Sequence, residues 1–145
     1  SDRIGNDYDV KELGWNYYMN EFSAIIGLMQ LKKLDKLNKK RQVFAKRYFN
    51  ELKFDQKMEF NNNYSYHLYW ILVKNRKMFM KKLKEKNVEI GIHYKPIHTM
   101  TLYKNKVSLP ETDLINNHIV SLPIHANLSE NDVSKIIKYV NLYNS

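Results

Sequence analysis

The 145-residue sequence contains no cysteine, only three prolines and only four glycines. Without cysteine the chain has no disulfide bonds, no thiolate nucleophile and no cysteine-based zinc site. The four glycines are too scattered for a glycine-rich phosphate loop. No apolar run approaches the roughly 18 residues of a membrane-spanning helix, and no apolar stretch follows the start Ser1-Asp2-Arg3 as a signal peptide would require. These absences predict a cytoplasmic protein that does not contact a membrane.

The composition predicts one folded domain with a basic surface. Hydrophobic residues make up 43% of the chain, which is enough for a core at this length. Lysine and arginine number 24 against 15 acidic residues, a net charge of +9 that suits an anionic partner. Much of this charge lies in residues 32–47, where it is typical of a solvated helix face. The RNP1 and GXXG signatures are absent, which disfavours a nucleic-acid partner.

A long amphipathic helix dominates the first third of the chain. Asn20 is a good N-cap, and apolar residues then recur at helical spacing from Phe22 to Leu52, with no proline between them. Such a helix is long for a globular domain and suits a spine that joins two domains or lies on a partner. We therefore expect an irregular, extended lead-in over residues 1–19 and a domain over 20–145.

Shorter elements follow the long helix, each bounded by a turn or capping residue. Asn87 is expected in the left-handed conformation that ends a helix, and Pro96 ends a strand. The expected elements are a strand over 64–73, a helix over 75–86, a strand over 88–94, a helix over 110–120, an extended piece over 121–124 and a final helix after a Ser129–Asp132 capping box. This order predicts an α+β fold with a small, mostly antiparallel sheet and helices on one face.

Two segments carry candidate binding chemistry. The side-chain amide of Asn16, in a turn just before the long helix, could donate to a phosphate oxygen or could only stabilise the turn. In residues 93–98, His93, Tyr94 and His98 surround a proline turn that could point polar groups at a ligand. A metal site would need a further ligand that the segment does not supply. No arrangement of residues predicts a catalytic nucleophile.

The other three histidines are interpreted as structural. His67 lies within an apolar strand and is expected to be a hydrogen-bonded core residue. His118 is expected to be exposed on a helix, and His125 to take part in local packing after the Leu122-Pro123 turn.

Several ordered blocks resemble the DegT/DnrJ/EryC1/StrS family of pyridoxal-phosphate-dependent sugar aminotransferases, in the small C-terminal domain and the segment that leads into it. Together they extend over nearly the whole chain, and their order and spacing are more specific than any one block. The blocks are Gly14–Phe22 with the helix that follows, Gln30–Asn38, Tyr66–Tyr69, Gly91–His98 and Ser121–Ser129.

The resemblance implies a fold-type I aminotransferase that acts as a homodimer with active sites at the subunit interface. Such an enzyme moves an amino group from glutamate or glutamine to a nucleotide-linked keto-sugar, for polysaccharide, lipopolysaccharide or glycan biosynthesis. Asn16 would reach the phosphate of the partner's pyridoxal phosphate. Tyr94, His98 and His93 would lie on the substrate side.

The chain departs from the family pattern in two ways. It lacks the block with the Schiff-base lysine and Gly-Glu-Gly, the aspartate that pairs with the pyridine nitrogen and the residue that stacks on the ring. It also has Tyr18 where the family usually has arginine, which removes a fixed cation. We therefore expect the chain alone to bind no cofactor, to be inactive, and to expose the apolar face of its long helix.

The sequence alone does not decide where this chain comes from. It fits an excised domain, a truncated gene product or half of a split enzyme. The alternative function is a non-catalytic binding or dimerisation module of that fold, or a basic nucleic-acid-binding domain. The sequence does not specify the sugar, the nucleotide, the amino donor or the pathway.

Overall fold

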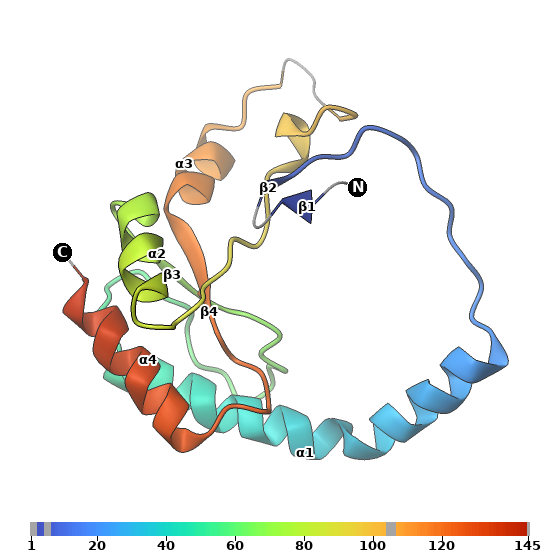
Figure 1. Ribbon diagram of the computed structural model, residues 1–145, viewed down its shortest axis with the longest axis horizontal. Helices are drawn as coiled ribbons and strands as arrows, with labels where there is room; N and C mark the ends of the chain where they lie inside the picture. Colours follow the sequence, from blue (N-terminus) through green and yellow to red (C-terminus); the bar gives the residue numbers. More distant parts are fainter. Residues whose placement is uncertain (1–2, 5–6, 104–106, 145) are drawn as a thin grey trace.

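The computed structural model describes residues 3–4, 7–103 and 107–144, and within them the chain is built around one long helix and a short antiparallel strand pair (Figure 1). The elements in chain order are β1 (Arg3–Ile4), β2 (Asp7–Tyr8), α1 (Glu21–Glu51), β3 (Tyr69–Leu72), α2 (Arg76–Lys84), the 3-10 helix η1 (Ile97–Thr99), α3 (Pro110–His118), β4 (Ile119–Leu122) and α4 (Glu130–Leu142). The α+β prediction is confirmed.

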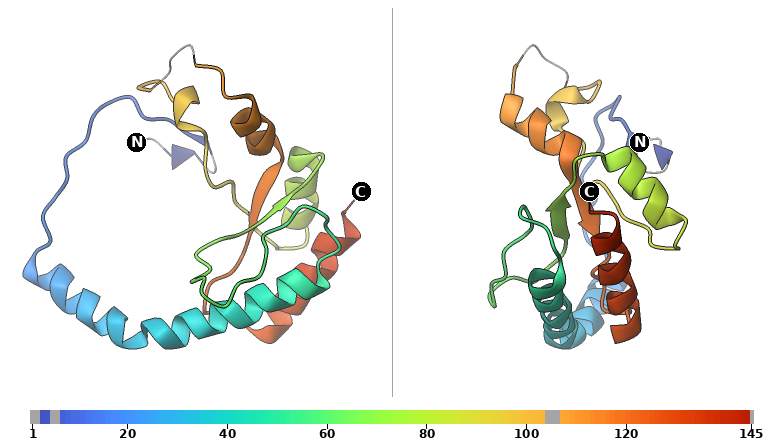
Figure 2. Two further views of the ribbon diagram at one scale, coloured as in Figure 1. Left: turned by 180° about the vertical axis from the view of Figure 1, so that it is seen from behind. Right: turned by 90° about the vertical axis from the view of Figure 1, so that its left-hand side faces the viewer.

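Helix α1 begins and ends where the sequence predicts, but its two halves have different surroundings. The side chain of Asn20 accepts a hydrogen bond from the backbone N–H of Ser23 at 2.9 Å and caps the first turn. The buried residues of α1 all lie in its C-terminal half: Phe44, Ala45 and Tyr48. Large apolar side chains in the N-terminal half are exposed, as expected, with Phe22 at 80%. Figure 2 shows this half extending beyond the rest of the domain.

The sheet is shorter than predicted. β3 pairs antiparallel with β4, and single bridges add Lys57 opposite Ile71 and Gly91 opposite Ser121. The predicted strand over 64–73 is thus reduced to four residues. The predicted strand over 88–94 is wrong, because only Gly91 exchanges backbone hydrogen bonds with the neighbouring strand before the chain turns toward η1.

The core lies between one face of this sheet, the C-terminal half of α1 and α4. Tyr69 and Ile71 of β3 pair with Leu122 and Val120 of β4 and are buried with them. The ring centroids of Tyr48 and Tyr69 are 5.2 Å apart, and the Tyr48 hydroxyl donates to the Pro123 carbonyl at 2.6 Å. Burial raises the pKa of the Tyr48 hydroxyl, which stays protonated as a donor. Helix α4 contributes Val133, Ile136, Ile137 and Val140.

The remaining turns follow the predicted local chemistry closely. Ser129 and Asp132 form the expected capping box at α4. Asn75 caps α2, and Asn87 has φ 55°, so the predicted left-handed stop is confirmed, although α2 itself ends at Lys84. His118 is partly buried rather than exposed, because its Nδ1 lies 2.9 Å from the Val73 carbonyl oxygen.

The N-terminal segment is not wholly irregular. β1 and β2 pair antiparallel, which the sequence did not predict. The extended lead-in begins only after β2 and runs to α1. No helix within the described residues has the length and apolar character needed to cross a membrane.

Replacing Tyr48 by phenylalanine should lower the free energy of unfolding by about 1–2 kcal/mol, because the Pro123 carbonyl then loses its hydrogen-bond donor in a part-buried site. Urea denaturation of the chain measures this. The matched control is Tyr64→Phe, since Tyr64 is 46% exposed and its ring is retained. Equal stability of the two variants would show that the hydroxyl contact does not support the core.

Candidate functional site

An exposed arm, residues 9–20, carries the candidate phosphate contact. Figures 1 and 2 show the arm as an open arc between β2 and the start of α1. Asn16 is exposed in the middle of it, and its neighbour Tyr18 is 99% exposed. Trp15 and Tyr17 are exposed as well. Because large aromatic side chains gain from burial, this surface is typical of one that a further protein body covers.

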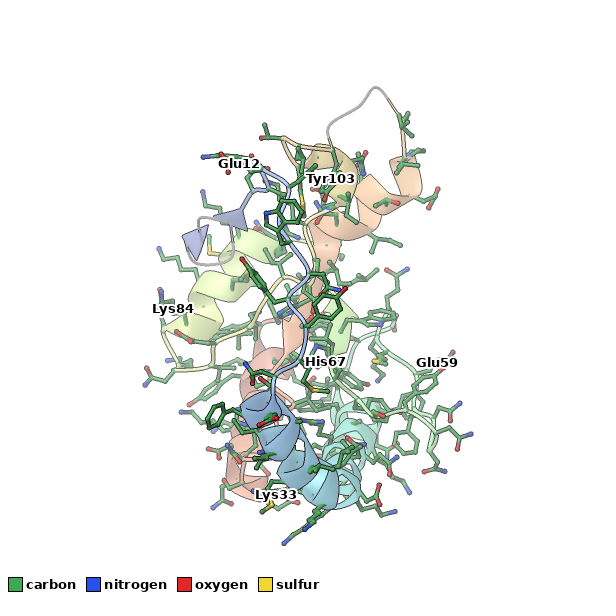
Figure 3. All side chains as sticks on the ribbon, turned by 90° about the vertical axis from the view of Figure 1, so that its right-hand side faces the viewer. Glu12, Lys33, Glu59, His67, Lys84 and Tyr103 are labelled. Carbon is green, nitrogen blue, oxygen red and sulfur yellow. The ribbon has the colours of Figure 1, made fainter. Side chains whose placement is uncertain are left out.

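The first residues of the arm are fixed to the segment that follows η1. A carboxylate oxygen of Asp9 accepts hydrogen bonds from the backbone N–H groups of Val10 at 2.9 Å and Thr101 at 2.7 Å, and the Thr101 hydroxyl donates to the other oxygen. The Leu102 N–H donates to the Val10 carbonyl at 2.8 Å. The hydrogen bond from the Thr101 hydroxyl is the main cause that lowers the pKa of Asp9, so the carboxylate is charged at neutral pH. Figure 3 labels Glu12 and Tyr103 at this end of the molecule.

The loop over residues 91–99 carries the three predicted substrate-side residues, but it points them differently. Tyr94 is 58% exposed and follows a cis peptide bond from His93. The side chain of His98 is only 14% exposed, and its Nε2 lies 3.0 Å from Oδ1 of Asp113 on α3. His98 therefore joins η1 to α3, whereas Tyr94 is free to meet a ligand.

His93 is folded back over Gly91. A methyl group placed on Gly91 would lie 2.5 Å from Cε1 of the His93 ring, so the ring occupies the space of the missing side chain. Its Nδ1 is buried without a hydrogen-bond partner in the described part of the chain. Burial, and then the nearby ring of His67, lower the pKa of His93 below 6.5, so His93 is neutral at pH 7.

A pocket of about 920 Å³ opens beside this ring, between α1, the Gly91–Ser121 bridge and the start of α4. We call it the histidine pocket, and its lining includes Arg41, His67, His93, Ser121, His125 and Lys135. Its lining does not include Tyr94, His98 or Asn16. The structure thus groups His93 with two histidines that the sequence treated as structural and separates it from the other predicted site residues.

Two of those interpretations are wrong. His67 is exposed rather than a core residue, because Tyr66 takes the inward position at 2% exposure and its φ of 46° turns the next side chain outward. His125 is also exposed and lines the pocket instead of packing locally. Figure 3 shows His67 behind the arm.

Sequence reasoning missed the polar residues of the pocket, above all Ser121. The sequence offers one indication of it, because Ser121 is a polar residue in the short apolar piece Val120–Leu122. In the structure Ser121 is 3% exposed. The sequence does not distinguish Arg41 and Lys135 from the other lysines and arginines, which number 24 in all. No cluster of three or more histidine, aspartate or glutamate side chains suited to a metal ion occurs in residues 3–4, 7–103 and 107–144.

Replacing Gly91 by alanine should lower the free energy of unfolding by about 1–3 kcal/mol, because the His93 ring must move. The pKa of His93 should rise toward 6.5 as the ring becomes solvated. Urea denaturation and an NMR titration of the ring protons measure the two effects.

Gly27→Ala is the matched control, since nothing lies within 4 Å of the added methyl group. It should raise stability by about 0.5–1 kcal/mol through helix propensity. A Gly91→Ala chain with wild-type stability and an unchanged His93 pKa would contradict the ring placement.

Comparison with known proteins gives a consistent family match. The model of the DegT/DnrJ/EryC1/StrS aminotransferase family matches residues 2–141. Among curated proteins, uncharacterized protein MJ1066 of Methanocaldococcus jannaschii is 28% identical over 149 residues, which cover 92% of this chain and 39% of that protein.

Solved structures of aminotransferases are similar over most of the chain. A DegT DnrJ EryC1 StrS aminotransferase from Brucella abortus is 28% identical with a TM-score of 0.81, over 96% of this chain and 39% of its own. PseC of Helicobacter pylori, an aminotransferase involved in the biosynthesis of pseudoaminic acid, is 31% identical with a TM-score of 0.76, over 91% and 39%. The chain thus spans about two fifths of the length of these relatives.

Proposed function

Because the chain belongs to the DegT/DnrJ/EryC1/StrS aminotransferase family, we propose that it acts as the C-terminal part of a sugar aminotransferase that uses pyridoxal phosphate. The observation that carries this proposal is the family match over residues 2–141, which includes the exposed arm with Asn16. Structural relatives include Spr1654 of Streptococcus pneumoniae, which has been solved in a PLP form.

The residues of this chain fit one contact with the phosphate of the cofactor, and they do not make up a whole cofactor site. Pyridoxal phosphate supplies the electron sink for amino transfer when it is bound. Asn16 fits a phosphate contact, because its exposed side-chain amide can donate to a phosphate oxygen. The given residues contain no Gly-Glu-Gly block to accompany a Schiff-base lysine. The chain therefore provides one phosphate donor, and the rest of the cofactor site belongs to other protein residues.

The proposed reaction moves an amino group from glutamate or glutamine to a nucleotide-linked keto-sugar in the cytoplasm. The net charge of +9 supports an anionic, phosphate-bearing substrate. Within the loop over residues 91–99, the accessible phenol of Tyr94 is placed to hydrogen-bond such a substrate. His98 would act at the edge of that site while it holds η1 on α3.

We also propose that the enzyme is a homodimer in which Asn16 serves the cofactor of the partner subunit. The exposed arm supports this, because Asn16 is exposed on it and the arm itself extends away from the rest of the domain (Figure 2). The exposed apolar side chains at the start of α1 support it too, since a dimer or a large domain would remove them from water. They are Phe22, Ile25, Ile26, Leu28, Met29 and Leu31.

The coding sequence upstream of Ser1 should continue in frame through a lysine followed by Gly-Glu-Gly. The longer protein should bind pyridoxal phosphate and transfer an amino group from glutamate, whereas the 145-residue chain should do neither. In the longer protein, Asn16→Ala should weaken cofactor binding about tenfold, because a hydrogen bond to the charged phosphate is lost. Titration of the visible absorbance of the bound cofactor measures this.

Asn117→Ala is the matched control, since Asn117 is an exposed asparagine that belongs to α3 and not to the arm. Equal cofactor affinity in the two variants would reject the role of Asn16. The 145-residue chain could instead bind pyridoxal phosphate stoichiometrically, with the cofactor trapped on one of its lysines by borohydride. That result would reject the proposal that other protein residues complete the cofactor site. Salt-sensitive binding to generic RNA or DNA without amino transfer would instead support the alternative of a basic nucleic-acid-binding domain.

A further inference from the structure

One carboxylate attaches the start of the exposed arm to the segment that follows η1. Thr101 donates to the carboxylate of Asp9 twice, through its backbone N–H at 2.7 Å and through its hydroxyl. The N–H of Val10 adds a third hydrogen bond at 2.9 Å, and the Leu102 N–H donates to the Val10 carbonyl at 2.8 Å. Hydrogen bonds to a charged carboxylate are stronger than those between neutral groups. We call this set of contacts the Asp9 latch, and the bond through Val10 keeps it from turning about a single point.

The segment to which the latch attaches is itself fixed to the body of the domain. Met100 is buried, at 5% exposure. Just before it, the Thr99 hydroxyl donates to the Pro96 carbonyl at 2.7 Å and closes the turn of η1. Nε2 of His98 lies 3.0 Å from Oδ1 of Asp113 and joins the same turn to α3. The latch therefore holds the arm on a fixed base and not on a loop that moves freely.

The latch and the N-cap of α1 limit where Asn16 can lie. Residues 11–20 between these two attachments are all exposed, and Asn20 at the far end accepts a hydrogen bond from the Ser23 N–H at 2.9 Å. An extended chain spans at most about 3.5 Å per residue, so Asn16 lies within roughly 14 Å of Asn20 and roughly 21 Å of Val10. Within this chain, loss of the latch leaves only the first of these limits, and Asn16 then swings on a short tether from the helix.

We propose that Asp9 is a positioning residue: by holding the first end of the arm on the η1 segment, it keeps Asn16 where its amide can donate to the phosphate of the cofactor. The Asp9 carboxylate is engaged by Val10 and Thr101, so it acts through the arm and not on the cofactor itself. An arm that is ordered beforehand loses less conformational entropy when it meets a ligand. This proposal rests on the phosphate contact proposed above for Asn16.

A double-mutant cycle in the longer protein tests the proposal, with titration of the visible absorbance of the bound cofactor as the measurement. Asp9→Ala should weaken cofactor binding about fivefold, because the arm must then be ordered during binding. In the Asn16→Ala background the same change should have no further effect, since Asp9 acts through Asn16. Glu12→Ala is the matched control and should keep wild-type affinity, because Glu12 is an exposed carboxylate on the same arm but outside the latch.

A second pair of variants changes the other side of the latch. Thr101→Val removes only the hydroxyl donor and should weaken cofactor binding about twofold, whereas Thr101→Ser keeps that donor and should keep wild-type affinity. In the 145-residue chain, hydrogen exchange of the Thr101 and Leu102 amides measures the latch without the cofactor. Exchange of both amides should become faster in Asp9→Ala and stay unchanged in Glu12→Ala.

Two results would overturn the proposal even though Asn16→Ala weakens cofactor binding. One is wild-type affinity in Asp9→Ala, and the other is an equal loss of affinity from Asp9→Ala with and without Asn16. Unchanged exchange of the Thr101 amide in Asp9→Ala would overturn the latch itself. If Asn16→Ala keeps wild-type affinity, the proposed phosphate contact fails, and the positioning role fails with it even where exchange shows that the latch forms.

Discussion

The contact between the C-terminal half of α1 and the β3–β4 pair is the constraint on which the rest of the domain depends. Tyr48 packs its ring on Tyr69 of β3 and donates its hydroxyl to Pro123 just after β4, so one side chain connects the helix with both strands. Arg47, next to it, contacts Glu130 at 2.9 Å and thereby holds the start of α4 against α1. The short sheet is stable because these contacts bury one of its faces.

The same arrangement leaves the N-terminal half of α1 and the arm without cover. Once residues 44–48 are fixed in the core, the helix continues beyond the edge of the sheet, and its first turns carry apolar side chains into solvent (Figure 1). The chain therefore has two parts with different roles. One part is a packed core, and the other exposes apolar side chains of the kind that a further protein body covers.

Local capping and periodicity predicted the helices well because those signals act over a few residues. Asn20, Ser129 with Asp132, and Asn87 each perform the predicted role, since a cap needs only its own turn. The strand over 88–94 and the side-chain directions of His67 and His98 could not be predicted in this way. They depend on contacts with segments far along the chain, namely the Gly91–Ser121 bridge, the inward Tyr66 and the carboxylate of Asp113. Ser121 was missed for the same reason, because its unpaired hydroxyl is visible only in three dimensions.

The division of α1 into an anchored half and an uncovered half is the central claim, and native-state hydrogen exchange along the helix tests it most directly. At concentrations where the chain is monomeric, amides in residues 44–51 should exchange only through global unfolding, and those in residues 22–34 through local opening at a far lower free energy. In the longer protein, the second group should become as protected as the first. Uniform protection from Glu21 to Glu51 in the monomeric chain would contradict the account.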